Sequence, residues 1–263
     1  MSLIFQISSL AKQVSNDILL PNFGRVDIDV KQDGSWVTIA DTKAHQRLME
    51  ELPKLVDYPV LSEEMTEDEQ QTILNNRPQN YWCIDPLDGT SNFTQGIPFW
   101  CMSIALIENG KMKLGVVYDP NRDECFAASE SLESSEATLN GVSLDQGDCS
   151  IVDLNETIGL IDFKRLDNKK LLALASNPPY RSQRSFGSSA LDLCWIAAKR
   201  CHIYLHGKQK LWDYSAGLLV LKNAKGCAET FNGDEIFEND LDSKSVIAAC
   251  NSQLMEQWKK YFN

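Results

Sequence analysis

The chain reads Trp82-Cys83-Ile84-Asp85-Pro86-Leu87-Asp88-Gly89-Thr90-Ser91-Asn92-Phe93 at the point that decides its fold. An apolar run leads directly into two aspartates three residues apart, which predicts a strand that ends in carboxylates. Asp85 and Asp88 supply hard anionic oxygens, which suit Mg²⁺ rather than a soft metal. The Gly89-Thr90 pair can open a helix, whose first N–H groups would hold a phosphate beside that metal. The segment therefore indicates a metal-assisted phosphatase.

Composition limits the class of protein. The 263 residues are 43% hydrophobic and carry a net charge of −12. Such a chain can bury a core as one large domain or as two smaller ones. The negative charge argues against nucleic-acid binding, because that binding depends on Lys and Arg neutralising backbone phosphates. The same charge would repel a phosphorylated substrate, and bound divalent cations would reverse its sign at the site.

The cysteines and the N-terminus bear on the cellular compartment. Eight cysteines are spread along the chain without a Cys-x-x-Cys pair, and several lie in apolar runs. We expect buried, reduced thiols. The N-terminus lacks a basic leader with an uninterrupted apolar run, and no segment approaches the roughly 20 apolar residues that span a bilayer. These features predict a soluble, cytoplasmic protein without membrane contact.

Apolar spacing and turn residues predict alternating helices and strands without an internal repeat. In the first half we expect a helix from residue 3 to about 21 and helices beginning near 41 and 66. Strands are expected at 26–30, 36–40, 59–64 and 82–84, with a turn over 31–35 and a hairpin formed by 101–107 and 112–118. The stretch over 119–147 is expected to be turn-rich, with a tight turn at 140–141. In the second half we expect a strand at 157–161, a polar stretch through 178–179, helices over 188–199 and 213–224, a strand at 245–250 and a terminal helix.

This order of elements is typical of an α/β or α+β chain. The composition becomes polar around residues 145–155, where we place a domain boundary. An N-terminal α+β domain over 1–147 would carry most candidate metal ligands. A C-terminal α/β domain over 148–263 would carry Asp213 and the segment that sets substrate specificity.

Four carboxylates share one context, because each follows an apolar or β-prone segment: Asp41, Glu63, Asp85 and Asp213. Strand ends at one edge of a sheet are where α/β proteins assemble their sites. Asp88 joins the set three residues after Asp85. Like charges about 4 Å apart repel by about 4 kcal/mol at an effective dielectric near 20, so such a cluster calls for divalent cations.

Simpler interpretations exist for each carboxylate alone. An isolated Asp-x-x-Asp is more often a turn or a cap than a metal site. Asp41 and Asp213 could each cap the helix that follows, and Glu63 with Glu64 could be a solvated pair. The evidence for a metal site is therefore the whole set of carboxylates in this order along the chain, and not any one of them alone.

The quoted segment resembles the first signature of the inositol monophosphatase family, and Trp212-Asp213-Tyr214-Ser215-Ala216-Gly217 resembles the second. Further similarity covers residues 37–41, 62–64, 96–99, 103–106 and 186–189. The resemblance implies a layered α/β/α/β/α sandwich and Mg²⁺-dependent, lithium-sensitive hydrolysis of a phosphomonoester. Family members are commonly homodimers, so the resemblance also implies a homodimer.

The resemblance also implies metal ligands. Glu63, Asp85 and the Leu87 carbonyl oxygen would hold a first Mg²⁺, and Asp85, Asp88 and Asp213 would hold a second. Glu63 would also reach a third, weaker site. Metal coordination lowers the pKa of water from near 16 towards roughly 7 to 9, which makes hydroxide available at neutral pH.

Catalytic and substrate contacts follow from the same resemblance. Asp41 paired with the Thr90 hydroxyl would orient and deprotonate the attacking water on the first metal, with Glu63 as the third catalytic residue. The phosphate and substrate contacts would come from Asp88, Gly89, Thr90, Gly187, Ser189 and His206.

The chain departs from the family in the substrate-specificity segment, residues 204–211. Relatives that act on inositol phosphate carry a Glu there, and the matching position is Leu205 or His206. His206 could contact the substrate or lie in a solvated loop. Lys208 and Lys210 could bind a second anionic group or be surface charges.

Other signals conflict over the substrate. Residues 31–38 resemble the form of nucleotidase and histidinol-phosphatase branches, whereas residues 90–93 have the inositol-phosphatase form, and the segment 129–137 lacks the family's glycine turn. The leading expectation is a phosphatase for a small polyol phosphate such as inositol monophosphate. The alternatives are a 3′(2′),5′-bisphosphate nucleotidase (with Arg181 and Arg184 as further cations), a histidinol-phosphatase, a fructose-1,6-bisphosphatase, or a partner-binding protein that retains the fold.

Overall fold

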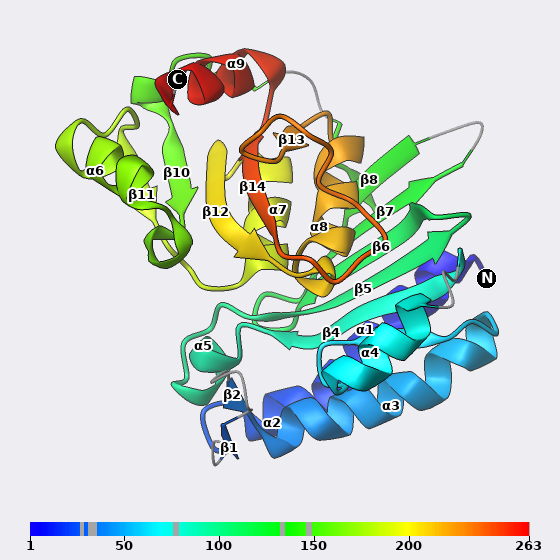
Figure 1. Cartoon of the computed structure of the whole chain (residues 1–263). Helices are drawn as coiled ribbons and strands as arrows, with labels where there is room; N and C mark the ends of the chain where they lie inside the picture. Colours follow the sequence, from blue (N-terminus) through cyan, green and yellow to red (C-terminus); the bar gives the residue numbers. More distant parts are fainter. Residues whose placement is uncertain (27–28, 31–35, 76–78, 132–134, 146–148, 263) are drawn as a thin grey trace.

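The computed structural model describes residues 1–26, 29–30, 36–75, 79–131, 135–145 and 149–262. These residues form five layers in the order helix, sheet, helix, sheet, helix (Figure 1). Two buried helices separate a seven-stranded sheet from a five-stranded sheet, and further helices cover the outer faces. The sandwich expected from the sequence is confirmed.

Helices from the first 55 residues cover the outer face of the larger sheet. The elements are α1 (Leu3–Val14), a π-helical turn (Ser15–Leu19), α2 (Leu20–Asn22), β1 (Asp29–Val30), β2 (Trp36–Val37) and α3 (Ile39–Leu55). In α3, Ala44, Leu48 and Leu52 recur at helical spacing and are fully buried. This packing holds the N-terminal end of α3, and with it Asp41, against the sheet.

The larger sheet has the strand order β3-β4-β5-β6-β7-β8-β9. Its strands are β3 (Val60–Ser62), β4 (Tyr81–Asp88), β5 (Cys101–Glu108), β6 (Lys111–Asp119), β7 (Glu124–Glu130), β8 (Ser135–Leu139) and β9 (Val142–Ser143). β3 runs parallel to β4, and α4 (Glu67–Asn75) connects them. β4 is buried along its whole length and is followed by α5 (Thr90–Thr94). The carboxylates at the end of β4 therefore lie inside the protein.

The smaller sheet has the strand order β11-β10-β12-β14-β13. Its strands are β10 (Ile158–Ile161), β11 (Ser182–Arg184), β12 (Ile203–Gln209), β13 (Cys227–Glu229) and β14 (Lys244–Ala249). Two 3₁₀ turns, η2 (Leu154–Glu156) and η3 (Phe163–Arg165), flank β10. α6 (Asn168–Ser176) and α9 (Ser252–Phe262) lie on the outer side (Figure 1). The buried Trp258 of α9 donates through Nε1 to the Tyr204 carbonyl oxygen at 3.0 Å, which fixes α9 on β12.

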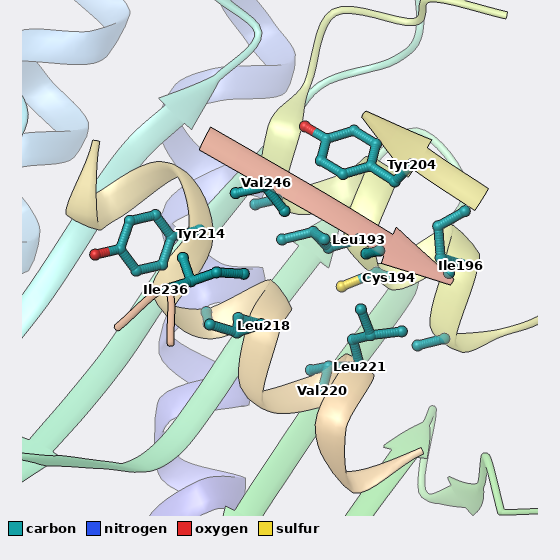
Figure 2. Packing of buried hydrophobic residues seen from close by; sticks show 14 of the residues in the cluster. Leu193, Cys194, Ile196, Tyr204, Tyr214, Leu218, Val220, Leu221, Ile236 and Val246 are labelled. Carbon is teal, nitrogen blue, oxygen red and sulfur yellow. The ribbon is translucent and has the colours of Figure 1, made fainter. Parts of the chain in front are cut away.

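α7 (Ser189–Ala197) and α8 (Leu211–Asn223) form the central layer. α8 is apolar on nearly all sides, as expected for a helix between two sheets. Figure 2 shows its Leu218 and Leu221 in the core that also holds Leu193 of α7 and Val246 of β14. A Cβ added at Gly217 would lie 2.8 Å from the Ala190 carbonyl oxygen, so glycine allows the two helices to approach closely.

We expect Gly217→Ala to lower the free energy of unfolding by about 1–3 kcal/mol, because the added methyl group overpacks the α7–α8 contact. In an ordinary helix the same change raises stability by about 1 kcal/mol, so the sign of the effect identifies the contact. Urea unfolding measures it, with the exposed substitution Glu256→Ala as control. A gain in stability would contradict the close approach.

Several predicted elements are confirmed. The hairpin of residues 101–107 and 112–118 is formed by β5 and β6. The tight turn at 140–141 joins β8 to β9, and both of its residues have positive φ. The helices predicted over 188–199 and 213–224 are α7 and α8.

Three expectations were wrong. The strand predicted at 36–40 stops at Val37, because Thr38 caps α3 and the helix begins at Ile39. Leu211 and Trp212 are the first turn of α8 rather than a strand end, since an apolar pair in a buried helix has no periodicity of its own. The stretch over 119–147, expected to be turn-rich, contains β7, β8 and β9.

Some expectations stay open. The turn at 31–35 and the domain boundary at 147/148 lie outside the described residues. The chain leaves the larger sheet at residue 143 and enters the smaller one at residue 158. The two-domain division remains a prediction, and one buried apolar cluster contains residues of both sheets.

The cysteines agree with the expectation from the sequence. All eight are among the described residues and are free, and six of them are buried. Across the described ranges, we find no helix that combines the length and apolar character needed to cross a membrane.

Candidate active site

The site is centred on the end of β4. In a regular strand, residues three apart face opposite sides. The pairing of β4 with β5 shifts between Asp85, opposite Ser103, and Asp88, opposite Cys101. This β-bulge contains Pro86 and inserts one extra residue, which brings Asp85 and Asp88 to the same side of the sheet. Two aspartates three residues apart can therefore face the same site because the β-bulge interrupts the strand between them.

Glu63 lies beside Asp85 because β3 and β4 are parallel and Ser62 pairs with Ile84. The Glu63 N–H donates to the Ile84 carbonyl oxygen at 3.2 Å. Burial, then repulsion from Glu63 and Asp88, raises the pKa of Asp85 well above its usual range, and the Glu63 and Asp85 side chains share a hydrogen bond. Asp85 is only 2% exposed.

Asp213 reaches the same place from α8. The Ser103 hydroxyl, opposite Asp85 in the sheet, donates to the Trp212 carbonyl oxygen at 3.3 Å and fixes the start of the helix. Asp213 stands in the first helical turn, where the Lys210 N–H donates to its Oδ2 at 2.8 Å. Burial, followed by repulsion from Glu63 and Asp88, raises the pKa of Asp213 well above its usual range.

The chemistry of this donor set fits a hard divalent cation. The set consists of oxygen atoms alone, namely the carboxylates of Glu63, Asp85, Asp88 and Asp213 and the carbonyl oxygen of Leu87. Each of the three aspartates has a pKa raised by burial, and a bound cation would relieve the repulsion among them.

In this structure the carboxylates of the donor set are not arranged as the ligands of a bound metal ion. No three acidic, histidine or cysteine residues in the described part of the chain are arranged to hold a metal ion. Asp88 and Asp213 each use one carboxylate oxygen for hydrogen bonds to helix N-termini. Binding of a cation would require these carboxylates to turn or to share their remaining oxygens.

Asp41 and Thr90 meet at the edge of the carboxylate cluster. Asp41 Oδ2 accepts from the Thr38 N–H at 2.8 Å and from its hydroxyl at 2.5 Å. Asp41 Oδ1 is left facing the Thr90 hydroxyl at 3.3 Å, and that hydroxyl also lies 3.1 Å from the Leu87 carbonyl oxygen. Burial, and secondarily the charge of Glu64, raises the pKa of Asp41 to about 6.

A tight loop follows β4. Gly89 has a φ of +98°, and a Cβ there would lie 3.2 Å from both the Phe99 carbonyl oxygen and the Trp100 side chain. α5 begins directly after it. Asn92 Nδ2 donates to the Phe99 carbonyl oxygen at 2.7 Å and to the Phe186 carbonyl oxygen at 2.6 Å. Asn92 thus joins this loop to the segment before α7, a role that no motif in the sequence indicates.

The segment before α7 closes on Asp88. The Ser188 hydroxyl donates to Asp88 Oδ2 at 2.7 Å and the Ala190 N–H donates to it at 2.8 Å. The Ser189 N–H also bonds to Asp88, and its hydroxyl bonds to Tyr204. Gly187 has a φ of +85° and lies against the Asn92 side chain. The structure therefore brings Gly187 and Ser189 to the site, with the polar groups of Ser189 engaged within the chain.

His206 does not lie in a solvated loop, and that alternative was wrong. It lies in β12, is 5% exposed and has its Nε2 3.0 Å from Asp162 Oδ2. The Lys208 N–H donates to its Nδ1 at 3.3 Å. Contact of His206 with a substrate remains a prediction.

Two residues near His206 were missed by the sequence analysis. Asp162 and Arg165 lie at the two ends of the turn η3. The positive charge of Arg165 acts on Asp213 and partly offsets the rise in the pKa of Asp213. No motif in the sequence marks either residue, since contact with β12 alone brings them to the site.

Comparison with known proteins agrees with this geometry. Residues 2–263 match the inositol monophosphatase family. The fructose-1,6-bisphosphatase/inositol-1-monophosphatase of Thermotoga maritima is 29% identical over 257 residues, which cover 91% of this chain and 92% of the relative. The Nus factor SuhB of Pasteurella multocida is 30% identical over 258 residues, or 95% of this chain and 92% of the relative.

A solved structure extends the agreement to the fold. An IMPase from Thermotoga maritima matches with a TM-score of 0.85 and 28% identity, covering 100% of this chain and 97% of that protein. Sequence, fold and the cluster of carboxylates around β4 lead to one assignment. The chain belongs to the inositol monophosphatase family and is a phosphoric monoester hydrolase.

Proposed function

We propose that the protein hydrolyses the phosphate ester of a small phosphorylated metabolite with Mg²⁺ as cofactor, and that a polyol phosphate such as inositol monophosphate is the leading substrate class. One observation supports this above the others: the carboxylates of Glu63, Asp85, Asp88 and Asp213, of which Asp85 and Asp88 are buried, gather around the end of β4 close to the Asp41–Thr90 pair. This arrangement offers sites for cations beside a group that can take a proton.

The proposed ligands would be shared between two Mg²⁺ ions. Glu63, Asp85 and the Leu87 carbonyl oxygen would hold one Mg²⁺, and Asp85, Asp88 and Asp213 would hold another, with a third and weaker site at Glu63. When bound, Mg²⁺ supplies charge stabilisation for the phosphate and lowers the pKa of water towards neutrality.

Asp41 and Thr90 would handle the proton. The 3.3 Å separation of Asp41 Oδ1 and the Thr90 hydroxyl lets the pair orient a water molecule beside the carboxylates. With its pKa raised to about 6, Asp41 is ionised at neutral pH and is basic enough to accept a proton. The phosphate oxygens would be held by the N–H groups of Gly89 and Thr90, with Gly187, Ser189 and His206 as further substrate contacts.

The alternatives within the family are bisphosphate nucleotidase, histidinol-phosphatase and fructose-1,6-bisphosphatase activity. The name of the Thermotoga maritima relative includes fructose-1,6-bisphosphatase, which supports testing that ester. A different class is a partner-binding protein, and the relative that is a Nus factor favours keeping it as the second candidate. A homodimer and a cytoplasmic location remain part of the proposal.

Phosphate release with and without Mg²⁺ tests the proposal. The substrates are inositol 1-phosphate, adenosine 3′,5′-bisphosphate, histidinol phosphate, fructose 1,6-bisphosphate and glycerol 2-phosphate. We expect Mg²⁺-dependent release with the highest kcat/KM on one of them. Asp85→Asn serves as the blank, and the exposed Asp57→Asn is the matched control. Absence of metal-dependent release from every ester would reject the enzyme proposal and favour the partner-binding class.

A further inference from the structure

Glu63 differs from the other proposed ligands of the first Mg²⁺ site, which consists of Glu63, Asp85 and the Leu87 carbonyl oxygen. Asp85 and Leu87 both belong to β4, which is buried along its whole length. Glu63 follows β3, a three-residue strand that pairs with β4 at the edge of the larger sheet. The distance from Glu63 to the two ligands on β4 therefore depends on how the chain is held where it leaves β3.

The chain turns directly after β3. The Met65 N–H donates to the Ser62 carbonyl oxygen at 3.3 Å, so Glu63 and Glu64 are the two central residues of a four-residue turn. Glu63 thus stands beyond the last paired residue of the strand. The carbonyl oxygens of this turn need partners outside the sheet, because buried backbone groups are rarely left without a hydrogen bond.

Gln70 of α4 supplies those partners. Its side-chain Nε2 donates to the Ser62 carbonyl oxygen at 2.9 Å and to the Met65 carbonyl oxygen at 3.2 Å, and the Glu63 carbonyl oxygen lies 3.5 Å away. Gln70 is only 5% exposed, so its amide would leave buried carbonyl oxygens without a partner if it were removed. One buried amide therefore holds both ends of the turn that carries Glu63.

The helix that carries Gln70 is anchored by contacts of its own. The Thr66 N–H and hydroxyl donate to Glu69 Oε2 at 2.9 and 2.8 Å, and the Glu69 N–H donates to the Thr66 hydroxyl at 3.3 Å. This reciprocal pair caps the N-terminus of α4. Further along the helix, Leu74 is buried in the apolar core. The position of the Gln70 amide is thus set by α4 and not by the turn that it holds.

A second side chain meets the turn from α3. His45 Nδ1 lies 2.9 Å from the Ser62 hydroxyl, and that hydroxyl accepts from the Glu64 N–H at 3.3 Å. His45 follows Asp41 by four residues, so the two lie on the same face of α3. The turn that carries Glu63 is therefore held between α3 and α4.

We propose that Gln70 is a positioning residue for the first Mg²⁺ site: it fixes the turn over 62–65 and thereby the distance from Glu63 to Asp85 and the Leu87 carbonyl oxygen. The inference rests on the proposed function, in which these groups share an ion. A ligand that is already held in place loses less conformational freedom when the ion binds. Gln70 lies outside the segments that resemble the family, so this contact belongs to the chain's own way of holding Glu63.

Calorimetric titration of the metal-free protein with Mg²⁺ tests the inference without turnover, in two backgrounds that separate the proposed ions. Asp213→Asn removes a ligand of the second ion, so the titration reports the first site. Glu63→Gln removes a ligand of the first ion, so the titration reports the second site. Each background is compared with and without Gln70→Met, which removes the amide but keeps an unbranched side chain.

We expect Gln70→Met to weaken Mg²⁺ binding about 10-fold in the Asp213→Asn background and to leave it unchanged in the Glu63→Gln background. A residue that only supported the fold would change both titrations alike. Gln71→Met is the matched control, because Gln71 is exposed and bonds to Asn75 of the same helix. It should leave both titrations unchanged.

Gln70→Asn keeps the amide but shortens its reach by one methylene group, and it replaces Gln70→Met if that variant does not fold. Unchanged Mg²⁺ affinity of the first site in the folded variant would overturn the inference, and so would an equal loss in both backgrounds. The phosphatase proposal would stand in either case. A wild-type protein that binds no Mg²⁺ would instead overturn the proposed function itself.

Discussion

Asp85→Asn is expected to abolish Mg²⁺-dependent phosphate release, with a loss of roughly 10³-fold or more, because the lost contacts to cations supply several kcal/mol of transition-state stabilisation. Asp85 is the centre of the cluster: it shares a hydrogen bond with Glu63 and is repelled by Asp88 and Asp213.

The same substitution should raise the stability of the metal-free protein. The pKa of Asp85 is raised in the folded state by burial and by its acidic neighbours. A raised pKa means that the folded state binds the proton more tightly than the unfolded chain, so the ionised carboxylate destabilises the fold at neutral pH. An amide at this position removes that cost.

Thermal unfolding with and without Mg²⁺ measures both effects. Wild type and Asp57→Asn should gain stability as Mg²⁺ is added, by linkage to a ligand that binds the folded state. Asp85→Asn should start from a higher melting temperature and gain little. Near-normal turnover in Asp85→Asn would contradict a site built around this carboxylate, and so would an undiminished response to Mg²⁺.

The sequence predicts those residues of the site that lie close together along the chain. Residues 84–93 contain the bulge, both aspartates and the loop glycine, so adjacency in the chain becomes adjacency in space. Glu63 follows from pairing of β3 with β4, which the apolar runs before each carboxylate indicate. The layered fold follows from the same motifs through the family resemblance.

The remainder depends on contacts between distant segments. Asp41 and Asp213 were each expected at the start of a helix after an apolar or β-prone segment, and both stand in the first turn of a helix. The apolar pair before Asp213 nevertheless belongs to α8 and not to a strand, because propensity does not distinguish a short apolar strand from the start of a buried helix. Both aspartates accept an N–H from the residue three positions earlier. Arg165 has no local signal at all, since its place is set by Gly207, 42 positions later.

Asp41→Asn is expected to lower kcat by about 10²- to 10⁴-fold with little change in KM, because the amide cannot accept the proton that the carboxylate takes. In the wild-type protein the pKa of Asp41, raised to about 6 by burial and by Glu64, should appear as an acid limb in the pH–rate profile. Activity should fall as the pH falls below about 6, since the base becomes protonated. A change in KM alone would contradict the role of Asp41 as a base.

The pKa of Asp41 also predicts a pH-dependent gain in stability for Asp41→Asn. The pKa is raised from 3.8 to about 6, so the ionised form costs the folded state up to about 3 kcal/mol. This cost is absent below about pH 4, develops between pH 4 and 6, and is complete above that range. Urea unfolding at pH 8 should therefore find the variant more stable than wild type, whereas the two should converge near pH 4. A variant that is less stable at both pH values would show that the Thr38 hydrogen bonds to the carboxylate outweigh the burial of its charge.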